Sequence, residues 1–121
     1  MNKDELLALL SKPKKPSKYK NEKSAVGDIS FDSKKEAKRW KELLLLEQGG
    51  YISGLQRQVK YVLIPKQEGE RECAYVADFV YTEGSVVVVE DVKSAMTAKL
   101  PAYVIKRKLM LWVHKIKIRQ V

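Results

Sequence analysis

Three runs in the middle of the chain have the hydrophobic pattern of β-strands, and they cover residues 55–64, 71–82 and 85–92. The last run contains four consecutive valines, Val86 to Val89, and such a continuous apolar stretch is typical of a central strand buried on both faces. Glu83-Gly84-Ser85 has the composition of a turn. We therefore predict that the second and third runs form a β-hairpin.

A helix is predicted over residues 33–48, ahead of these strands. Ser33, followed three residues later by Glu36, has the spacing of a capping box, and the glycines at 49 and 50 suit the end of a helix. On a helical wheel Trp40 and Leu43 fall on either side of Glu36. This apolar arc is expected to face the core or the sheet.

A second helix is predicted over residues 101–113, because Pro101 suits a first helical position and helical spacing follows it. Its predicted apolar stripe consists of Ile105, Leu109 and Trp112. We expect this stripe to face the core. The opposite side of the helix carries Tyr103, Lys106, Arg107 and Met110.

The remaining segments complete the predicted architecture. They are one or two helical turns in residues 1–10, a basic arm broken by prolines in 11–24, a short strand with a turn at Gly27-Asp28 in 25–31 and a last strand in 115–121. After the arm and the short strand, the predicted order is α-β-β-β-α-β, which places the chain in the α/β (α+β) class. We divide the chain into a short helix with a flexible arm over 1–24 and one domain over 25–121.

Three charged residues of the predicted hairpin carry the strongest chemical signal. Asp91 and Lys93 are two residues apart, so in a strand their side chains project to the same face. The hairpin can bring Asp78 back toward them. Two carboxylates and one ammonium group at the end of a strand are suited to metal-dependent phosphodiester cleavage, because carboxylate oxygens hold hard cations and the cation activates water.

The same residues have a plainer interpretation. Acids and lysines are common at solvated strand ends, and an Asp-x-Lys triplet alone is weak support for catalysis. The context strengthens the signal, because a buried strand that ends in charged residues needs partners for them.

Glu36 has two interpretations that the sequence leaves open. It can serve as the capping glutamate of its helix, or as a third acid of the site, since it falls within the apolar arc.

The composition narrows the possible functions. The 121 residues include one cysteine, Cys73, and one histidine, His114, so an internal disulfide and a structural zinc site of four Cys/His ligands are excluded. His114 lies at the end of a helical pattern and is interpreted as an ordinary helix-end residue. No apolar run approaches the roughly 18 residues of a membrane span, and no secretory signal is visible. We expect no membrane partner and a cytoplasmic location.

The net charge of +9 predicts an anionic partner, with nucleic acid as the first choice. Residues 99–121 contain seven basic residues and no acidic one, and residues 12–23 contain six lysines and one glutamate. A lysine-rich surface that only aids solubility is the competing interpretation. The predicted DNA-contacting residues are Lys99, Tyr103, Lys106, Arg107 and Lys108.

The order of elements, together with Glu36, Asp78 and the triplet Asp91-Val92-Lys93, resembles the PD-(D/E)xK nuclease superfamily. Within it the chain is similar to a small phage-associated domain family of unknown function. Four segments carry this resemblance, which extends over residues 19–121: 31–39, 64–67, 77–81 and 89–93. Ala77 stands where proline is usual, and Asp91 stands where many members have glutamate. Gln58, in the first strand of the meander, resembles a glutamine seen at this place in some relatives, which implies a supporting role, but an exposed polar position describes it equally well.

The resemblance implies a restriction-endonuclease-like core with a central mixed sheet flanked by helices. It also implies a mechanism in which Asp78, Asp91 and the carbonyl of Val92 bind Mg²⁺ or Mn²⁺. Glu36 would complete a second metal site or order a metal-bound water, and Lys93 would orient the attacking water. The expected function is a metal-dependent DNA endonuclease, with branched or junction DNA in phage DNA processing as the expected substrate.

Two other functions stay open. The chain can be a non-catalytic nucleic-acid-binding protein on the same fold, or an assembly protein whose basic face meets an acidic protein. A homodimer is a further expectation, because cutting both strands is easiest for a two-fold assembly.

Overall fold

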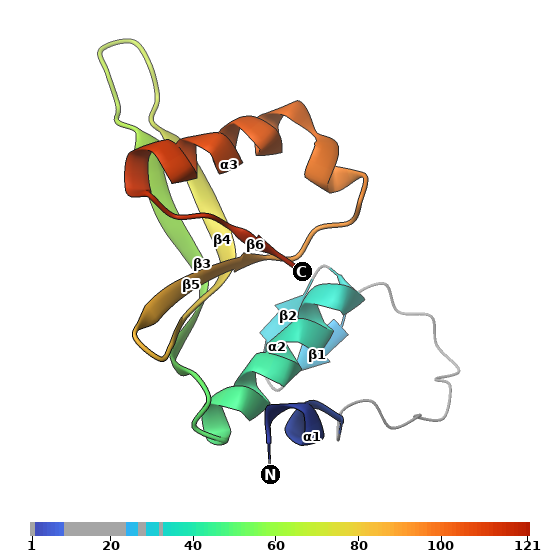
Figure 1. Cartoon of the computed structure of the whole chain (residues 1–121). Helices are drawn as coiled ribbons and strands as arrows, with labels where there is room; N and C mark the ends of the chain where they lie inside the picture. Colours follow the sequence, from blue (N-terminus) through green and yellow to red (C-terminus); the bar gives the residue numbers. More distant parts are fainter. Residues whose placement is uncertain (1, 9–23, 27–28, 32) are drawn as a thin grey trace. The chain divides into compact units, whose positions relative to one another are not determined.

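The computed structural model describes residues 2–8, 24–26, 29–31 and 33–121 (Figure 1). The chain forms two compact units, Met1–Leu55 and Gln56–Val121. We describe each unit by itself. The predicted basic arm lies outside the described residues apart from Ser24, and the division of the chain at residue 25 stays a prediction.

The first unit combines helices with a small two-stranded sheet. Its elements are α1 (Lys3–Ala8), β1 (Ser24–Val26), β2 (Ile29–Phe31) and α2 (Lys34–Gln48). The strands β1 and β2 are antiparallel. Strand structure is therefore confirmed in the segment 25–31, where two paired strands stand in place of the one predicted, and the predicted turn at Gly27-Asp28 lies outside the described residues.

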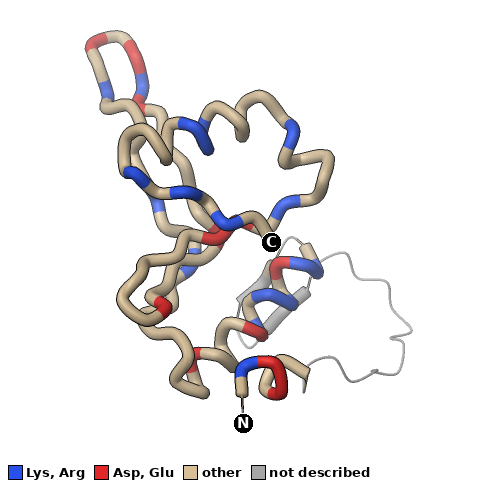
Figure 2. Tube along the Cα trace, in the orientation of Figure 1, with Lys and Arg blue, Asp and Glu red and all other residues tan. Residues whose placement is uncertain are grey.

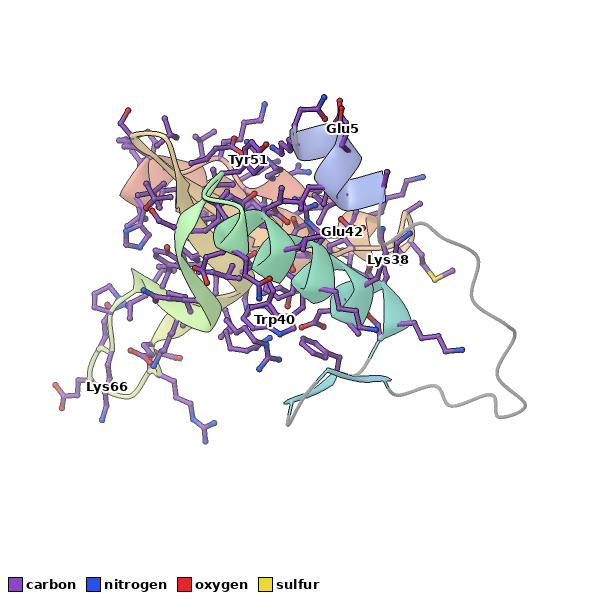
Figure 3. The ribbon with its side chains drawn as sticks, turned by 90° about the horizontal axis from the view of Figure 1, so that it is seen from below. Glu5, Lys38, Trp40, Glu42, Tyr51 and Lys66 are labelled. Atoms are coloured by element: carbon purple, nitrogen blue, oxygen red, sulfur yellow. The ribbon has the colours of Figure 1, made fainter. Side chains whose placement is uncertain are left out.

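Helix α2 begins and ends as its sequence predicts. The backbone N–H of Glu36 donates to Oγ of Ser33 over 3.1 Å, which satisfies one of the free donors of the first turn. At the other end Gly50 has a positive φ of 81°, a conformation that glycine adopts without strain. Trp40 and Leu43 are buried, as the apolar arc predicts. Figure 3 shows Trp40 on one side of the helix and Lys38 and Glu42 on the other.

The second unit is built on a mixed sheet of four strands in the order β3-β4-β5-β6. Strands β4 and β5 are antiparallel, whereas β5 and β6 are parallel. A parallel pair needs a crossover connection, and helix α3 provides it between β5 and β6. The elements are β3 (Ser53–Ile64, which starts in the first unit), β4 (Cys73–Glu83), β5 (Val86–Asp91), the 3₁₀ helix η1 (Thr97–Lys99), α3 (Pro101–His114) and β6 (Arg119–Gln120).

The predicted α-β-β-β-α-β order and the α+β class are confirmed. The last strand is shorter than predicted, since β6 contains two residues in place of seven. Within the described ranges no helix is both long and apolar enough to cross a membrane.

Strand β5 is buried over only part of its length. Val88 and Val89 are buried, but Val86 is 61% and Val87 57% exposed. The prediction of burial on both faces was therefore wrong for the first half of the strand. The reason is the short β6, which pairs only with Glu90 and Asp91 and leaves the start of β5 without a neighbour on that side.

Helix α3 buries the side opposite to the predicted one. Tyr103 and Met110 belong to the hydrophobic core of the sheet, whereas Ile105 is 57% and Trp112 75% exposed. The prediction was wrong for Ile105 and Trp112, whereas Leu109 of the same stripe packs against the core. Both sides of the helix carry large apolar side chains, so the sequence pattern did not distinguish them. The buried residues of the helix are Tyr103 and Met110, which are two turns apart and pack with Tyr75 and Val89 of the sheet and with Ile118, just before β6.

Candidate active site

Asp78, Asp91 and Lys93 meet where β4 and β5 run side by side, as the hairpin predicts. The backbone N–H of Val92 donates to Oδ2 of Asp78 over 2.9 Å. Nζ of Lys93 lies 3.5 Å from Oδ2 of Asp91. Asp78 is therefore tied to the backbone of the very triplet that carries the other two residues.

The position of the triplet is fixed by the last residues of the chain. The backbone N–H of Val121 donates to the carbonyl of Asp91 over 3.0 Å, and the N–H of Lys93 donates to the carbonyl of Val121 over 3.3 Å. These bonds continue the parallel pairing of β5 with β6 past the end of β5. They hold the triplet extended, so that Asp91 and Lys93 share one face.

Helix α3 contributes the aromatic surface beneath Lys93. Nζ of Lys93 lies 4.9 Å from the ring centroid of Tyr103, in cation–π geometry. The side-chain amide of Gln120 donates to the hydroxyl of Tyr103 over 2.9 Å. Strand β6 thus orients the tyrosine, and the tyrosine helps to orient the lysine.

Asp91 is almost fully buried, with 2% of its side chain exposed. Burial, which is the largest cause, and the neighbouring Asp78 together raise the pKa of Asp91 to about 7, against the opposing effects of Lys93 and Tyr75. Burial and the nearby Asp91 also raise the pKa of the Tyr75 hydroxyl.

Two atoms of this cluster have no proper hydrogen-bond partner in the part of the chain that the structure describes. They are Oδ2 of Asp91 and the hydroxyl of Tyr75, both buried. The two residues are near enough to influence each other's pKa, but their contact does not have hydrogen-bond geometry. Oδ2 of Asp91 has the 3.5 Å ion pair with Lys93 but no hydrogen bond, and a buried carboxylate oxygen in this state is costly, so the position favours a bound cation or proton.

The donor set around Asp91 fits a hard divalent cation. Mg²⁺ binds oxygen ligands, usually through one or two carboxylates, and keeps several of its waters. Asp78 and Asp91 supply two carboxylates, and Val92 supplies a backbone carbonyl beside them. Among the residues that the structure describes, no group of three or more His, Cys, Asp or Glu side chains forms a metal cluster.

Glu36, the fourth predicted site residue, lies on α2 in the first unit. Its backbone takes part in the predicted cap, and its side chain is half-buried. The capping interpretation of this position is therefore confirmed for the backbone N–H. The catalytic interpretation stays a prediction.

Gln58 lies on β3, where its φ of 52° is in the left-handed region. This conformation is uncommon for a residue other than glycine. Its side chain is exposed, as the plainer interpretation predicts. His114 is the last residue of α3, and its Nε2 lies 2.8 Å from the carbonyl of Val62, which fits the helix-end role.

The predicted DNA-contacting residues occupy different environments. Lys99 and Lys108 are exposed, and Lys106 and Arg107 are half-buried. Tyr103 is only 8% exposed and belongs to the core, which differs from the surface position that a DNA contact requires. Figure 2 shows basic residues recurring along α3 and the segment that follows it.

One buried group was missed by the sequence analysis. Glu90 has no exposed surface, and its carboxylate accepts a hydrogen bond from the hydroxyl of Tyr81. The guanidinium of Arg119 donates to the same hydroxyl over 3.2 Å. Strand alternation places Glu90 on the face opposite Asp91. That alternation was a usable signal, but Arg119 is 29 positions away in the chain and only the fold pairs them.

Comparison with known proteins gives one match. No curated protein and no solved structure matches the chain. A family model with the description "Protein of unknown function (DUF1064)" matches residues 16–120, which is most of the chain and includes the whole candidate site. The expected similarity to a family of unknown function is thereby confirmed, and the chain belongs to the DUF1064 family.

Proposed function

We propose that the protein is a divalent-metal-dependent DNA endonuclease of the PD-(D/E)xK type. The observation that carries this proposal is the buried Asp91, whose Oδ2 has no hydrogen-bond partner among the described residues and lies beside Asp78 and Lys93. Two carboxylates held together in this way repel each other unless a positive charge or a proton joins them. A bound metal ion would supply this positive charge and would also coordinate the Oδ2 atom of Asp91 that lacks a hydrogen bond.

Each residue of the cluster has a separate task in this proposal. Asp78 and Asp91, with the carbonyl of Val92, hold Mg²⁺ or Mn²⁺, which supplies Lewis acidity and lowers the pKa of a bound water. Lys93 orients the attacking water and offsets negative charge that develops on the phosphate. The Val92 N–H keeps Asp78 in place. Glu36 is proposed as a third acid of the same site.

The basic residues of α3 and of the last segment, residues 115–121, are proposed to hold the phosphate backbone of the DNA. Exposed lysines such as Lys99 and Lys108 contact phosphates without reading bases, so sequence selectivity is expected to be weak. Branched DNA, such as a junction or flap from phage DNA processing, is the proposed substrate.

The test is a cleavage assay with labelled four-way junction, flap, single-stranded and duplex DNA in Mg²⁺, Mn²⁺ or EDTA. Wild-type protein should cut in the presence of metal, and Asp78→Asn, Asp91→Ala and Lys93→Ala should lose the activity. Glu70→Ala and Lys66→Ala are matched controls that remove an exposed acid and an exposed lysine from the loop joining β3 and β4 (Lys66 is labelled in Figure 3). Cleavage at the wild-type rate by the Asp91 or Lys93 variant would contradict this assignment of the active site.

A non-catalytic DNA-binding protein is the second candidate. The observation that favours it is the recurrence of basic residues along α3 and the segment after it, which accounts for DNA binding without catalysis. This candidate predicts DNA binding that EDTA does not change, with no cutting of any substrate. The same assay, with a parallel binding measurement, separates the two functions.

A further inference from the structure

A cleft with a volume of about 360 Å³ opens in the second unit, immediately beside Lys93. It lies between β4 and the start of α3. The residues that give it its chemical character are Val76, Leu100, Ala102, Tyr103, Lys93 and Lys106.

The walls of the cleft combine apolar and cationic groups. Val76 and Leu100 leave 47% and 51% of their surface exposed, so the cleft presents apolar area to water. The two charged residues in its lining are both lysines, and no acidic residue belongs to the lining. A ligand that fits must therefore have a flat or apolar part and a negative charge.

Lys93 connects this cleft to the candidate active site. Its ammonium group lies 3.5 Å from Asp91 Oδ2 and 4.9 Å from the centroid of the Tyr103 ring, and both Lys93 and Tyr103 line the cleft. A DNA strand whose phosphate lies at Asp91 and Lys93 has its neighbouring nucleotide at the mouth of the cleft.

We propose that the cleft receives one unpaired nucleotide of the strand that is cut, next to the reacting phosphate. This inference rests on the proposed nuclease function and names its substrate class: DNA with an unstacked nucleotide at the cleavage site. The base covers the apolar surface of Val76, Leu100 and Ala102. Lys106 binds the phosphate on the far side of that nucleotide.

Paired DNA does not fit this site. A cleft of about 360 Å³ has room for a single nucleotide and none for a base pair with both backbones. A nucleotide in duplex DNA would have to leave its stack first, whereas one at a bulge, flap or branch is already unpaired. The cleft therefore favours DNA with a bulge, flap or branch, because no free energy is needed to unpair the nucleotide that enters it.

The test measures affinity in EDTA, so that it does not depend on cleavage. The probes are a fluorescent duplex with one extrahelical nucleotide and the fully paired duplex of the same sequence. Wild-type protein should bind the bulged duplex about tenfold more tightly, because stacking of one base on a protein surface gives an effect of this order. Ala102→Phe fills the cleft from an exposed helix position and should remove the preference.

Two lysines on α3 provide the matched control. Lys106→Ala removes a charge from the cleft and should reduce the preference for the bulged duplex. Lys108→Ala removes the same charge from an exposed position outside the cleft lining, and should weaken both DNAs equally without changing their ratio. Circular dichroism of each variant checks that α3 remains folded.

The outcomes separate the two proposals. Equal wild-type affinity for both duplexes, or a preference that survives Ala102→Phe, overturns the cleft assignment. A preference that disappears in Ala102→Phe supports it even when no DNA is cut in metal. In that case the nuclease proposal fails while the cleft remains a site for an unpaired nucleotide.

Discussion

Asp91 shows how burial and a neighbouring acid together shift the pKa of a carboxyl group. Its pKa rises from the ordinary 3.8 to about 7 because the carboxylate is buried and lies beside Asp78. Between these two pH values the folded protein binds a proton at Asp91 that the unfolded chain has released. The free energy of unfolding therefore falls, on account of this group, as the pH rises from 3.8 to about 7.

Asp91→Asn should stabilise the metal-free protein at pH 8 and change it little at pH 5. The amide stays neutral, so it avoids the cost of an ionised carboxylate at pH 8, whereas at pH 5 the wild-type residue is itself protonated. We expect the free energy of unfolding at pH 8 to increase by at least about 1 kcal/mol, which corresponds to a rise of several degrees in Tm. Thermal unfolding in EDTA measures it, with the exposed Glu70→Gln as control. A loss of stability at pH 8 would contradict the assigned pKa.

Divalent metal should make the wild-type protein more stable than Asp91→Asn at pH 8, which is the reverse of the order expected in EDTA. A cation that binds only the folded protein raises its stability by about 2.7 kcal/mol at a hundredfold excess over the Kd. Because the metal displaces the proton of Asp91, the rise in Tm with Mn²⁺ should be larger at pH 8 than at pH 6. Asp91→Asn should lose most of the rise. An equal rise in wild type and variant would place the metal elsewhere.

Helix α3 illustrates why periodicity alone did not identify the buried side of an element. Ile105 and Trp112 have the helical spacing of a core stripe, yet Tyr103 and Met110 face the core. The deciding contacts are long-range. Gln120, seventeen positions from Tyr103, binds its hydroxyl, and the sheet supplies the surface that Met110 covers.

The two sides of α3 should respond differently to truncation. Met110→Ala leaves a cavity in the core and should cost about 2–5 kcal/mol. Ile105→Ala removes an exposed side chain and should change stability by less than about 0.5 kcal/mol. Urea denaturation of both variants measures the difference. A larger cost for Ile105→Ala would mean that the predicted stripe, and not the observed side, is buried in solution.

The start of α2 allows the two interpretations of Glu36 to be separated. Glutamine also suits this position of a capping box, so Glu36→Gln should keep the stability within about 0.5 kcal/mol. If Glu36 is a third acid of the site, the same change should reduce metal-dependent cleavage by about 10- to 100-fold.

Ser33→Ala is the converse variant. It removes the oxygen that accepts from the Glu36 N–H, and should cost about 1 kcal/mol of stability without lowering the cleavage rate of the folded protein. Unchanged stability together with full activity in Glu36→Gln would assign Glu36 to capping alone.

At the scale of the whole molecule, the sequence predicted those features that depend on local rules. The turn at Gly84-Ser85 pairs Glu83 with Val86, and the same register pairs Phe79 with Glu90. One more step along this register brings Asp78 opposite Asp91, so a correct turn was sufficient to predict the convergence of the two acids. Tyr75 was not predictable in this way, because its place beside Asp91 depends on the packing of α3 against β4.

The overall charge leads to the last prediction. With a net charge of +9 and basic residues along α3 and the last segment (Figure 2), DNA binding should weaken steeply with salt. Each phosphate contact contributes about 0.9 to the slope of log K against log salt concentration. Lys117→Ala should reduce the slope by about this amount if Lys117 contacts a phosphate, whereas Lys66→Ala, on the β3–β4 loop, should not.

Titrations of a labelled duplex between low and physiological salt measure these slopes. A slope near zero in the wild type would mean that the lysines only keep the protein soluble, and would remove the support that the charge gives to a DNA partner. A steep slope that neither variant changes would place the DNA on other basic residues. Only a steep slope that Lys117→Ala reduces would show that residues 115–121 contact the DNA. The bound strand would then lie next to β6 and Val121, which pair with Asp91 and Lys93 through backbone hydrogen bonds.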